Sequence, residues 1–163
     1  MGTERQLCGE QVTLTVCTRD FWHAFYKAYV CDPMMDSTPY TYAFEQCDKL
    51  YVTKTSDPTR KYFAILHQGQ PAGCIYLKRM DVDKKISEFG IAMADDSVKN
   101  RGLGSEAIKL LVDYSFQVLG LETILADSVQ GNMRSQHVLT KAGFVMTHED
   151  DRFRYYRLDR DSA

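Results

Sequence analysis

Between a strand-like run and a strongly helical run, the chain reads Lys99-Asn100-Arg101-Gly102-Leu103-Gly104-Ser105-Glu106-Ala107. The two glycines allow the backbone to approach a ligand closely and to adopt angles that a Cβ atom would forbid. The free N–H groups of the first helical turn attract an anion, and the helix dipole favours negative charge there. With its two cationic side chains, the turn predicts a phosphate site; the alternative is a plain glycine turn before a surface helix.

The turn differs from the two best-known phosphate-binding motifs. No Gly-Lys-Ser/Thr closes it, so it is not a P-loop, and it is not the dinucleotide fingerprint, which needs G-x-G-x-x-G after a first strand and an acidic residue about 20 positions on. The motifs that follow it make its order similar to that of the GNAT superfamily of acetyl-CoA-dependent N-acetyltransferases. The matching residues are, in chain order, Lys99, Gly102, Gly104, Asn132, Ser135, Lys141, Ala142, Gly143 and Phe144.

This resemblance is close over about residues 86–144 and extends to the rest of the chain only in the order of elements. Lys99 stands where the family has Arg or Gln in its Arg/Gln-x-x-Gly-x-Gly/Ala turn. The segment 132–144 looks most like the branch that holds ribosomal-protein N-terminal acetyltransferases and related small-molecule acetyltransferases. The family implies an acetyl-CoA-dependent N-acetyltransferase.

Composition favours one globular domain over residues 1–163, with 44% apolar and 26% charged residues. A net charge of −2 gives no basic footprint for nucleic acid. No run of about 18 apolar residues predicts a membrane span, and the polar start predicts no signal peptide. The five cysteines lack a C-x-x-C pair and the four histidines lack ligand spacing, so we expect reduced thiols, a cytoplasmic protein and no metal.

Hydrophobic periodicity predicts strands that come first, followed by an alternation of strands and helices. A mixed sheet with helices on its faces follows, an α/β or α+β architecture. The family resemblance implies further that this sheet is strongly twisted and that two adjacent parallel strands splay apart to leave a cofactor cleft. The expected strands are 12–17, 61–67, 72–79, 86–94, 122–129, 144–147 and 153–158, and the expected helices begin near Asp20 and cover 42–53, 103–119 and 132–141.

Acetyl-CoA would occupy this cleft through three groups of residues. Anion donors for its pyrophosphate come from the turn, and a strand edge and an amide side chain pair with its pantetheine arm. Two alanines in the edge strand have core packing as an alternative, and Asn132 is also a candidate helix cap. The cofactor-binding candidates are Lys99, Asn100, Arg101, Gly102, Leu103, Gly104 and Ser105 in the turn, Ile91, Ala92 and Met93 at the strand edge, and Asn132.

Acyl transfer to an amine requires removal of a proton, because an alkyl ammonium with a pKa of about 10.4 cannot attack a thioester. Glu88 is the candidate base by resemblance, with a solvated or ion-paired strand residue as the alternative; Asp95, Asp96 and Asp127 are held in reserve. Many family members place a tyrosine acid where this chain has Leu139. The general acid is therefore unassigned, and Ser135 is the candidate to assist the departing thiolate.

The resemblance implies that the acceptor is a primary amine of a small molecule or a protein N-terminus. Its pocket is expected near the first helix and residues 32–51, where Trp22, Phe25, Tyr26 and Tyr29 form one aromatic stripe with core packing as its alternative. Two other functions stay open: a catalytically silent acyl-CoA-binding sensor or interaction module of the same fold, and an unrelated nucleotide-binding α/β domain. The sequence leaves the oligomeric state open, with a homodimer among the options.

Overall fold

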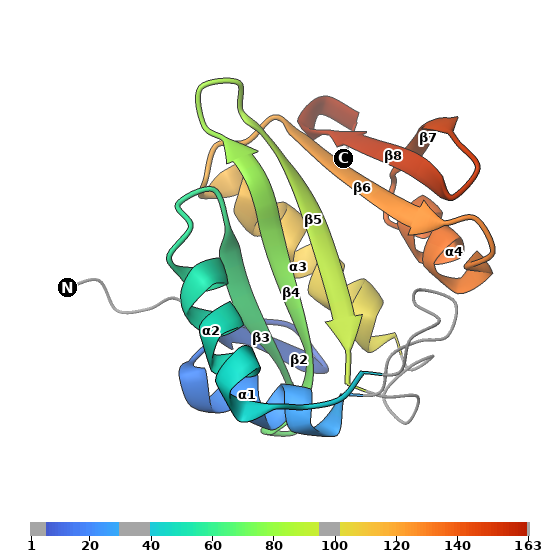
Figure 1. Ribbon diagram of the computed structural model, residues 1–163. Coiled ribbons are helices and arrows are strands. Elements are labelled where there is room, and N and C mark those ends of the chain that lie inside the picture. The colour runs from blue at the N-terminus through green and yellow to red at the C-terminus, as the bar shows by residue number, and fades with distance from the viewer. Residues whose placement is uncertain (1–5, 30–39, 95–101, 163) are drawn as a thin grey trace.

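The computed structural model describes residues 6–29, 40–94 and 102–162, and within them an eight-stranded mixed sheet runs through the molecule (Figure 1). Its strand order is β1-β2-β3-β4-β5-β6-β8-β7. The strands are β1 (Leu7–Cys8), β2 (Val12–Val16), β3 (Lys61–His67), β4 (Gln70–Asp81), β5 (Ile86–Met93), β6 (Thr123–Val129), β7 (Val145–Glu149) and β8 (Phe153–Asp159). The helices are α1 (Arg19–Ala28), α2 (Phe44–Thr55), α3 (Leu103–Gln117) and α4 (Met133–Lys141), with a 3₁₀ turn at Arg160–Ser162.

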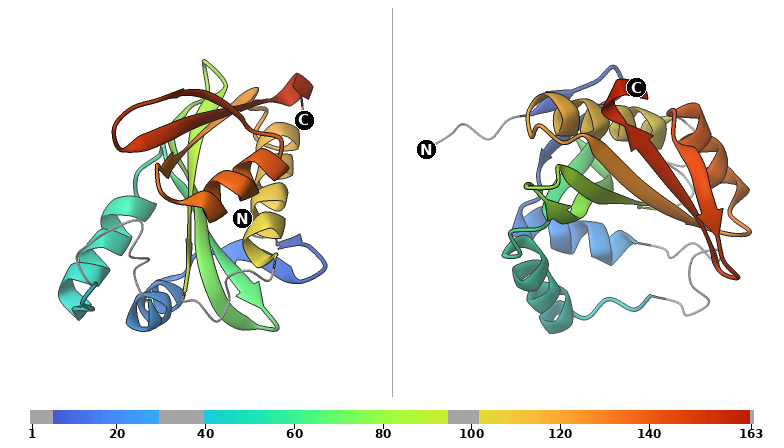
Figure 2. Two further views of the ribbon diagram at one scale, coloured as in Figure 1. Left: turned by 90° about the vertical axis from the view of Figure 1, so that its right-hand side faces the viewer. Right: turned by 90° about the horizontal axis from the view of Figure 1, so that it is seen from above.

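Helices cover both faces of this sheet, as the family resemblance implied. α1 and α2 pack on one face of the β2–β4 part, whereas α3 and α4 lie on the opposite side (Figures 1 and 2). The main core forms under α3, where Ala107, Ile108 and Leu111 are buried against the sheet. A second, smaller core of aromatic and cysteine side chains lies under α1. The predicted α/β class is therefore confirmed.

The β3–β4 hairpin follows the sequence pattern closely. Its turn contains Gln68 and Gly69 with φ of 52° and 74°, the left-handed pair that matches the twist of an antiparallel hairpin. The first helix differs from the prediction in its cap. Thr18, not Asp20, accepts the hydrogen bond from Phe21 N at 3.1 Å, while Asp20 lies in the first turn.

One strand pair in the sheet is parallel, and it separates early. β5 and β6 pair only at Ile86–Thr123, Ser87–Ile124 and Glu88–Leu125, although both strands continue beyond these positions. Past Glu88, β5 is paired to β4 alone. Because α3 connects β5 to β6, its N-terminus lies beside the widening gap (Figure 1). The splayed pair that the family implied is present, and it creates the candidate site.

Candidate functional site

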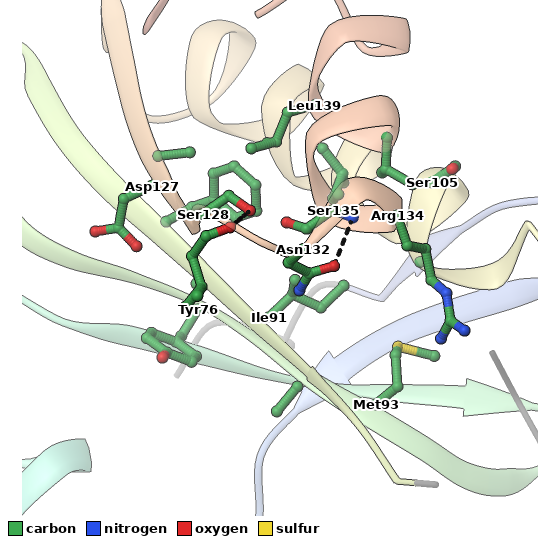
Figure 3. Close-up of a pocket in the computed structure, with 18 of the residues that line it drawn as sticks. Tyr76, Ile91, Met93, Ser105, Asp127, Ser128, Asn132, Arg134, Ser135 and Leu139 are labelled. Atoms are coloured by element: carbon green, nitrogen blue, oxygen red, sulfur yellow. Dashed lines mark hydrogen bonds between the residues drawn. The ribbon is translucent and has the colours of Figure 1, made fainter. Parts of the chain in front are cut away.

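A cleft of about 370 Å³ occupies the gap between the splayed strands (Figure 3). Residues 89–93 of β5 and 126–129 of β6 form its two sides, and the first turns of α3 and α4 complete it. This volume is within the range of small-molecule and cofactor sites. The cleft has three parts: the start of α3, the free edge of β5, and a narrow end where the strands meet.

At the start of α3, backbone donors are left without helical partners. Gly102 is the N-cap with φ of 77°, a left-handed conformation that favours glycine. The first helical hydrogen bond runs from Glu106 N to Gly102 O at 3.1 Å, so the N–H groups of residues 103–105 precede it. The candidates Gly102, Gly104 and Ser105 line the cleft. This end can bind an anion through backbone N–H groups and the helix dipole.

Of the other predicted residues of this turn, only Leu103 lies within the described residues. The side chain of Leu103 is buried in the main core, so its contribution to a ligand is limited to the backbone. Lys99, Asn100 and Arg101 lie outside the described residues. Glu106 faces away from the anion end, because its carboxylate accepts the N–H groups of Gln11 and Val12, each at 2.9 Å.

The middle of the cleft joins the free β5 edge to the start of α4. Ile91, Ala92 and Met93 all line it, and the unpaired side of their backbone can accept an extended ligand as a further strand would. Across the cleft, Asn132 caps α4 by accepting Ser135 N at 3.1 Å. The cap uses the Oδ1 atom, and the amide nitrogen lies on the Ile91 side (Figure 3). The capping and ligand-facing alternatives for Asn132 are thus compatible.

Two residues of α4 that were not predicted from the sequence belong to the site or support it. Arg134 lines the cleft and reaches its Met93 side, which brings a cation to the part nearest α3 (Figure 3). The buried Gln136 fixes the loop before α4 by donating to Val129 O at 3.1 Å and Gln130 O at 2.8 Å. The spacing Asn-x-Arg at a helix start was the available signal for Arg134.

The narrow end combines an aromatic ring with a carboxylate. Tyr76 is opposite Gly90 in the β4–β5 register and occupies the space that a side chain at position 90 would take. Burial, followed by the neighbouring phenol of Tyr62, raises the pKa of Tyr76 to about 12. Tyr76 is therefore a neutral hydrogen-bond donor at physiological pH. Asp127 of β6 lines the cleft on the other strand and is exposed.

Glu88 is close to this end but is not among the lining residues. Its carboxylate receives Arg79 Nη1 at 3.0 and 3.2 Å and lies 3.8 Å from Lys78 Nζ. Arg79 has φ of 51° at an irregularity in the β4–β5 register. Such a bulge redirects a side chain, here toward Glu88. The ion-paired alternative for Glu88 thus describes its contacts in this structure.

Most of the aromatic stripe of α1 packs in the second core. Trp22 and Phe25 are buried, whereas Tyr29 reaches the cleft. Leu139, in the place of the family tyrosine, is buried at the cleft wall.

The described residues contain neither a candidate membrane span nor a candidate metal site. No helix there is long and apolar enough to cross a lipid bilayer. No group of three or more His, Cys, Asp or Glu side chains there is arranged to hold a metal ion.

Acetyltransferases are among the known proteins of similar sequence or fold. The chain is 29% identical over 107 residues to spermidine N(1)-acetyltransferase of Escherichia coli K12, an alignment that covers 66% of this chain and 57% of the relative. The chain thus spans little more than half the length of that curated relative.

Solved structures match over longer stretches at low identity. Spermidine N-acetyltransferase of Vibrio cholerae in complex with CoA and spermine has a TM-score of 0.82 at 20% identity, covering 94% of this chain and 98% of that one. Campylobacter jejuni N-acetyltransferase PseH in complex with acetyl coenzyme A has a TM-score of 0.64 at 23% identity, covering 72% and 79%. At these identities the likeness shows the fold alone.

The family follows from the sequence match together with this fold. Residues 12–145, most of the chain, match the acetyltransferase (GNAT) domain. The finer resemblance to the ribosomal-protein branch stays a prediction. The splayed β5–β6 pair, the glycine turn at the start of α3 and the Asn132 cap of α4 all lie within the matched region, and the chain belongs to the GNAT acetyltransferase family.

Proposed function

We propose that this chain is an N-acetyltransferase that moves the acetyl group of acetyl-CoA to a primary amine by direct attack. The observation that carries the proposal is the cleft itself. One end offers uncapped helix N–H groups for a pyrophosphate, and the middle offers an unpaired strand edge for the amides of the pantetheine arm. A GNAT relative of known structure holds acetyl coenzyme A, which supports the same cosubstrate here.

Each part of acetyl-CoA has a proposed partner in this chain. The backbone of residues 102–105 binds the pyrophosphate, assisted by Arg134 and by the cationic residues of the preceding turn. Ile91–Met93 pair with the pantetheine arm along the β5 edge, and the free amide of Asn132 contacts it from α4. The thioester then lies toward the narrow end, where an amine can reach it from the α1 side.

Proton transfer is assigned to side chains near that end. Glu88 is proposed to accept the amine proton through water, since Arg79 already occupies its carboxylate and Glu88 is not among the residues that line the cleft. The hydroxyl of Ser135 is proposed to donate to the departing thiolate, because the Leu139 side chain has no polar atom. A backbone N–H of the β5 edge stabilises the oxyanion of the tetrahedral intermediate.

The acceptor is proposed to be a small-molecule amine, with a peptide N-terminus as the second option. The similarity to spermidine acetyltransferases supports the small-molecule class. We propose that residues 1–163 act as one N-acetyltransferase domain in the cytoplasm. A self-associating enzyme, at least a homodimer, is consistent with the dodecamer that one structural relative forms.

Thermal unfolding with candidate ligands tests the proposal. A ligand at about 100 times its Kd adds roughly 2.7 kcal/mol to the free energy of unfolding, so acetyl-CoA and CoA should raise Tm whereas NAD⁺ and ATP should not. Thiol release with a panel of amines then measures turnover. Stabilisation by NAD⁺ or ATP instead would contradict acetyl-CoA as the cosubstrate. Stabilisation by acetyl-CoA, with no release of the CoA thiol in the presence of any amine, would indicate a silent binding module.

A further inference from the structure

Asp127 is a carboxylate in the cleft that the proposed chemistry does not use. It is the one acidic side chain among the described residues that line the cleft. Among those residues it has no hydrogen-bond or ion-pair partner. Four other carboxylates on this half of the sheet are engaged: Glu88 by Arg79, Glu149 by Arg154, Asp150 by Tyr155 and Asp159 by Arg157.

The strand register places Asp127 at the mouth of the splay. It lies two residues beyond Leu125, the last β6 residue paired with β5, so it projects to the same face as Leu125. On its other side it is opposite Tyr155 in the β6–β8 register. The counterpart of Asp127 on β5, two residues beyond Glu88, is Gly90, whose bare backbone leaves the space beside it to the ring of Tyr76. Asp127 therefore has an aromatic residue on either side, Tyr155 on β8 and Tyr76 across the splay.

The electrostatics of both phenols agree with this placement. Burial is the main cause of the raised pKa of Tyr76, and the negative charge of Asp127 adds to it. The hydrogen bond to Asp150 is the main cause of the raised pKa of Tyr155, and Asp127 again adds to it. The carboxylate of Asp127 is thus near enough to both phenols to add to the increase in their pKa.

A carboxylate between aromatic rings suits an alkylammonium ion, which pairs with the charge and lays its methylene chain on the rings. The ammonium concerned cannot be the one that reacts. A nearby opposite charge stabilises the charged form of an amine, so Asp127 would favour the protonated state of the attacking amine, which must instead lose its proton. We infer that Asp127 binds a second, non-reacting ammonium group of the acceptor, and that the acceptor class is the linear alkyl diamines and longer polyamines.

This inference rests on the proposed function and is tested by a comparison of two acceptors. One is a linear diamine; the other is the amino alcohol of equal length, in which a hydroxyl replaces the second amine. Several chain lengths are assayed, since the length sets which group reaches Asp127. The variants are Asp127→Asn and, as the matched control, Asp83→Asn, which removes one exposed carboxylate in the β4–β5 turn far from the cleft.

The wild type should prefer the diamine in kcat/KM by about tenfold at its best length, the scale of one charge-assisted hydrogen bond. Asp127→Asn should abolish that preference by raising KM for the diamine alone, and Asp83→Asn should retain it. A preference that survives in Asp127→Asn overturns the inference. An equal loss of kcat for both acceptors also overturns it, because Asp127 would then be a proton acceptor.

Acetyl-CoA binding distinguishes a failure of the inferred acceptor class from a failure of the proposed function. Thermal unfolding with acetyl-CoA is measured on the wild type and on each variant, which also reports whether each variant folds. If acetyl-CoA raises Tm but no diamine is acetylated at any length, the acceptor class is wrong and the proposed function stands with another amine. If acetyl-CoA has no effect on the wild type, the proposed function itself fails.

Discussion

Replacing Gly90 by alanine should push Tyr76 out of its place at the narrow end of the cleft. A Cβ atom at position 90 would lie 2.5 Å from both Cζ and Oη of Tyr76 and 2.7 Å from its Cε2. The ring has little room to retreat, because it stacks on Tyr62 with centroids 4.7 Å apart. Tyr62 in turn packs edge-on against the buried Trp22 at 5.5 Å. Movement of the Tyr76 ring would therefore displace Tyr62 and Trp22, which belong to the second core.

Overpacking of this kind costs about 1–3 kcal/mol. Taking about 2 kcal/mol, a chain of this length should lose about 4–8 °C in Tm. The effect of alanine at position 90 on the free energy of unfolding should change sign when the Tyr76 ring is absent. In a Tyr76→Ala background, alanine at position 90 meets no obstacle and should stabilise the strand by about 0.5–1 kcal/mol, the usual advantage of alanine over glycine there. The coupling between the two positions is then about 2–3 kcal/mol.

Thermal or urea unfolding of four proteins measures this coupling: the wild type, Gly90→Ala, Tyr76→Ala and the double variant. Gly104→Ala is the control, because its Cβ would lie 3.7 Å from Ile91 Cδ1, an ordinary contact. The packing argument is refuted if Gly90→Ala is as stable as the wild type. It is equally refuted if alanine at position 90 costs the same with and without the Tyr76 ring.

Three further substitutions probe the cleft and its support. Gly104→Trp should abolish acetyl-CoA binding while the fold is retained, since the indole fills the space beside the α3 N-terminus; unchanged affinity in calorimetry would remove this turn from the binding site. Glu88→Gln should lower kcat at neutral pH by about 10²-fold or more with acetyl-CoA affinity preserved; equal turnover across pH would reassign the base. Glu106→Ala should cost about 1–3 kcal/mol in thermal unfolding, because backbone N–H groups of Gln11 and Val12 lose their acceptor; an Ala variant as stable as the wild type would contradict this, and an equal loss in the isosteric Glu106→Gln would show that the carboxylate charge is what these N–H groups require.

Local patterns were sufficient to predict most elements of this fold. The strand predicted at 61–67 is observed at Lys61–His67, because a short apolar run and a following Gln-Gly turn specify it locally. The helix predicted at 103–119 ends at Gln117, two residues early. The Thr18 cap was missed because threonine and Asp20 are both good caps, and the backbone angles that choose between them are not visible in the sequence.

The candidate site was predictable where it depends on consecutive residues and unpredictable where it depends on strand register. The glycine turn and the Asn132 cap are local, and both line the cleft as expected. Tyr76 reaches the cleft only because β4 places it opposite Gly90. The contacts of Glu88 depend on a bulge that turns Arg79 toward it, and bulges have no dependable sequence signal.

The absence of a tyrosine at position 139 is tolerable in the proposed reaction because its two proton transfers differ in cost. An alkyl thiol has a pKa of about 8.5, so a thiolate leaving at pH 7 is only about 2 kcal/mol less stable than its protonated form. An alkyl amine has a pKa of about 10.4, and removing its proton at pH 7 costs about 4.6 kcal/mol. An acid at position 139 would therefore reduce only the smaller of these two free-energy costs, that of the departing thiolate. The buried Leu139 instead forms part of the cleft wall. The larger cost, removal of the amine proton, must be met by the residues that bind and position the amine.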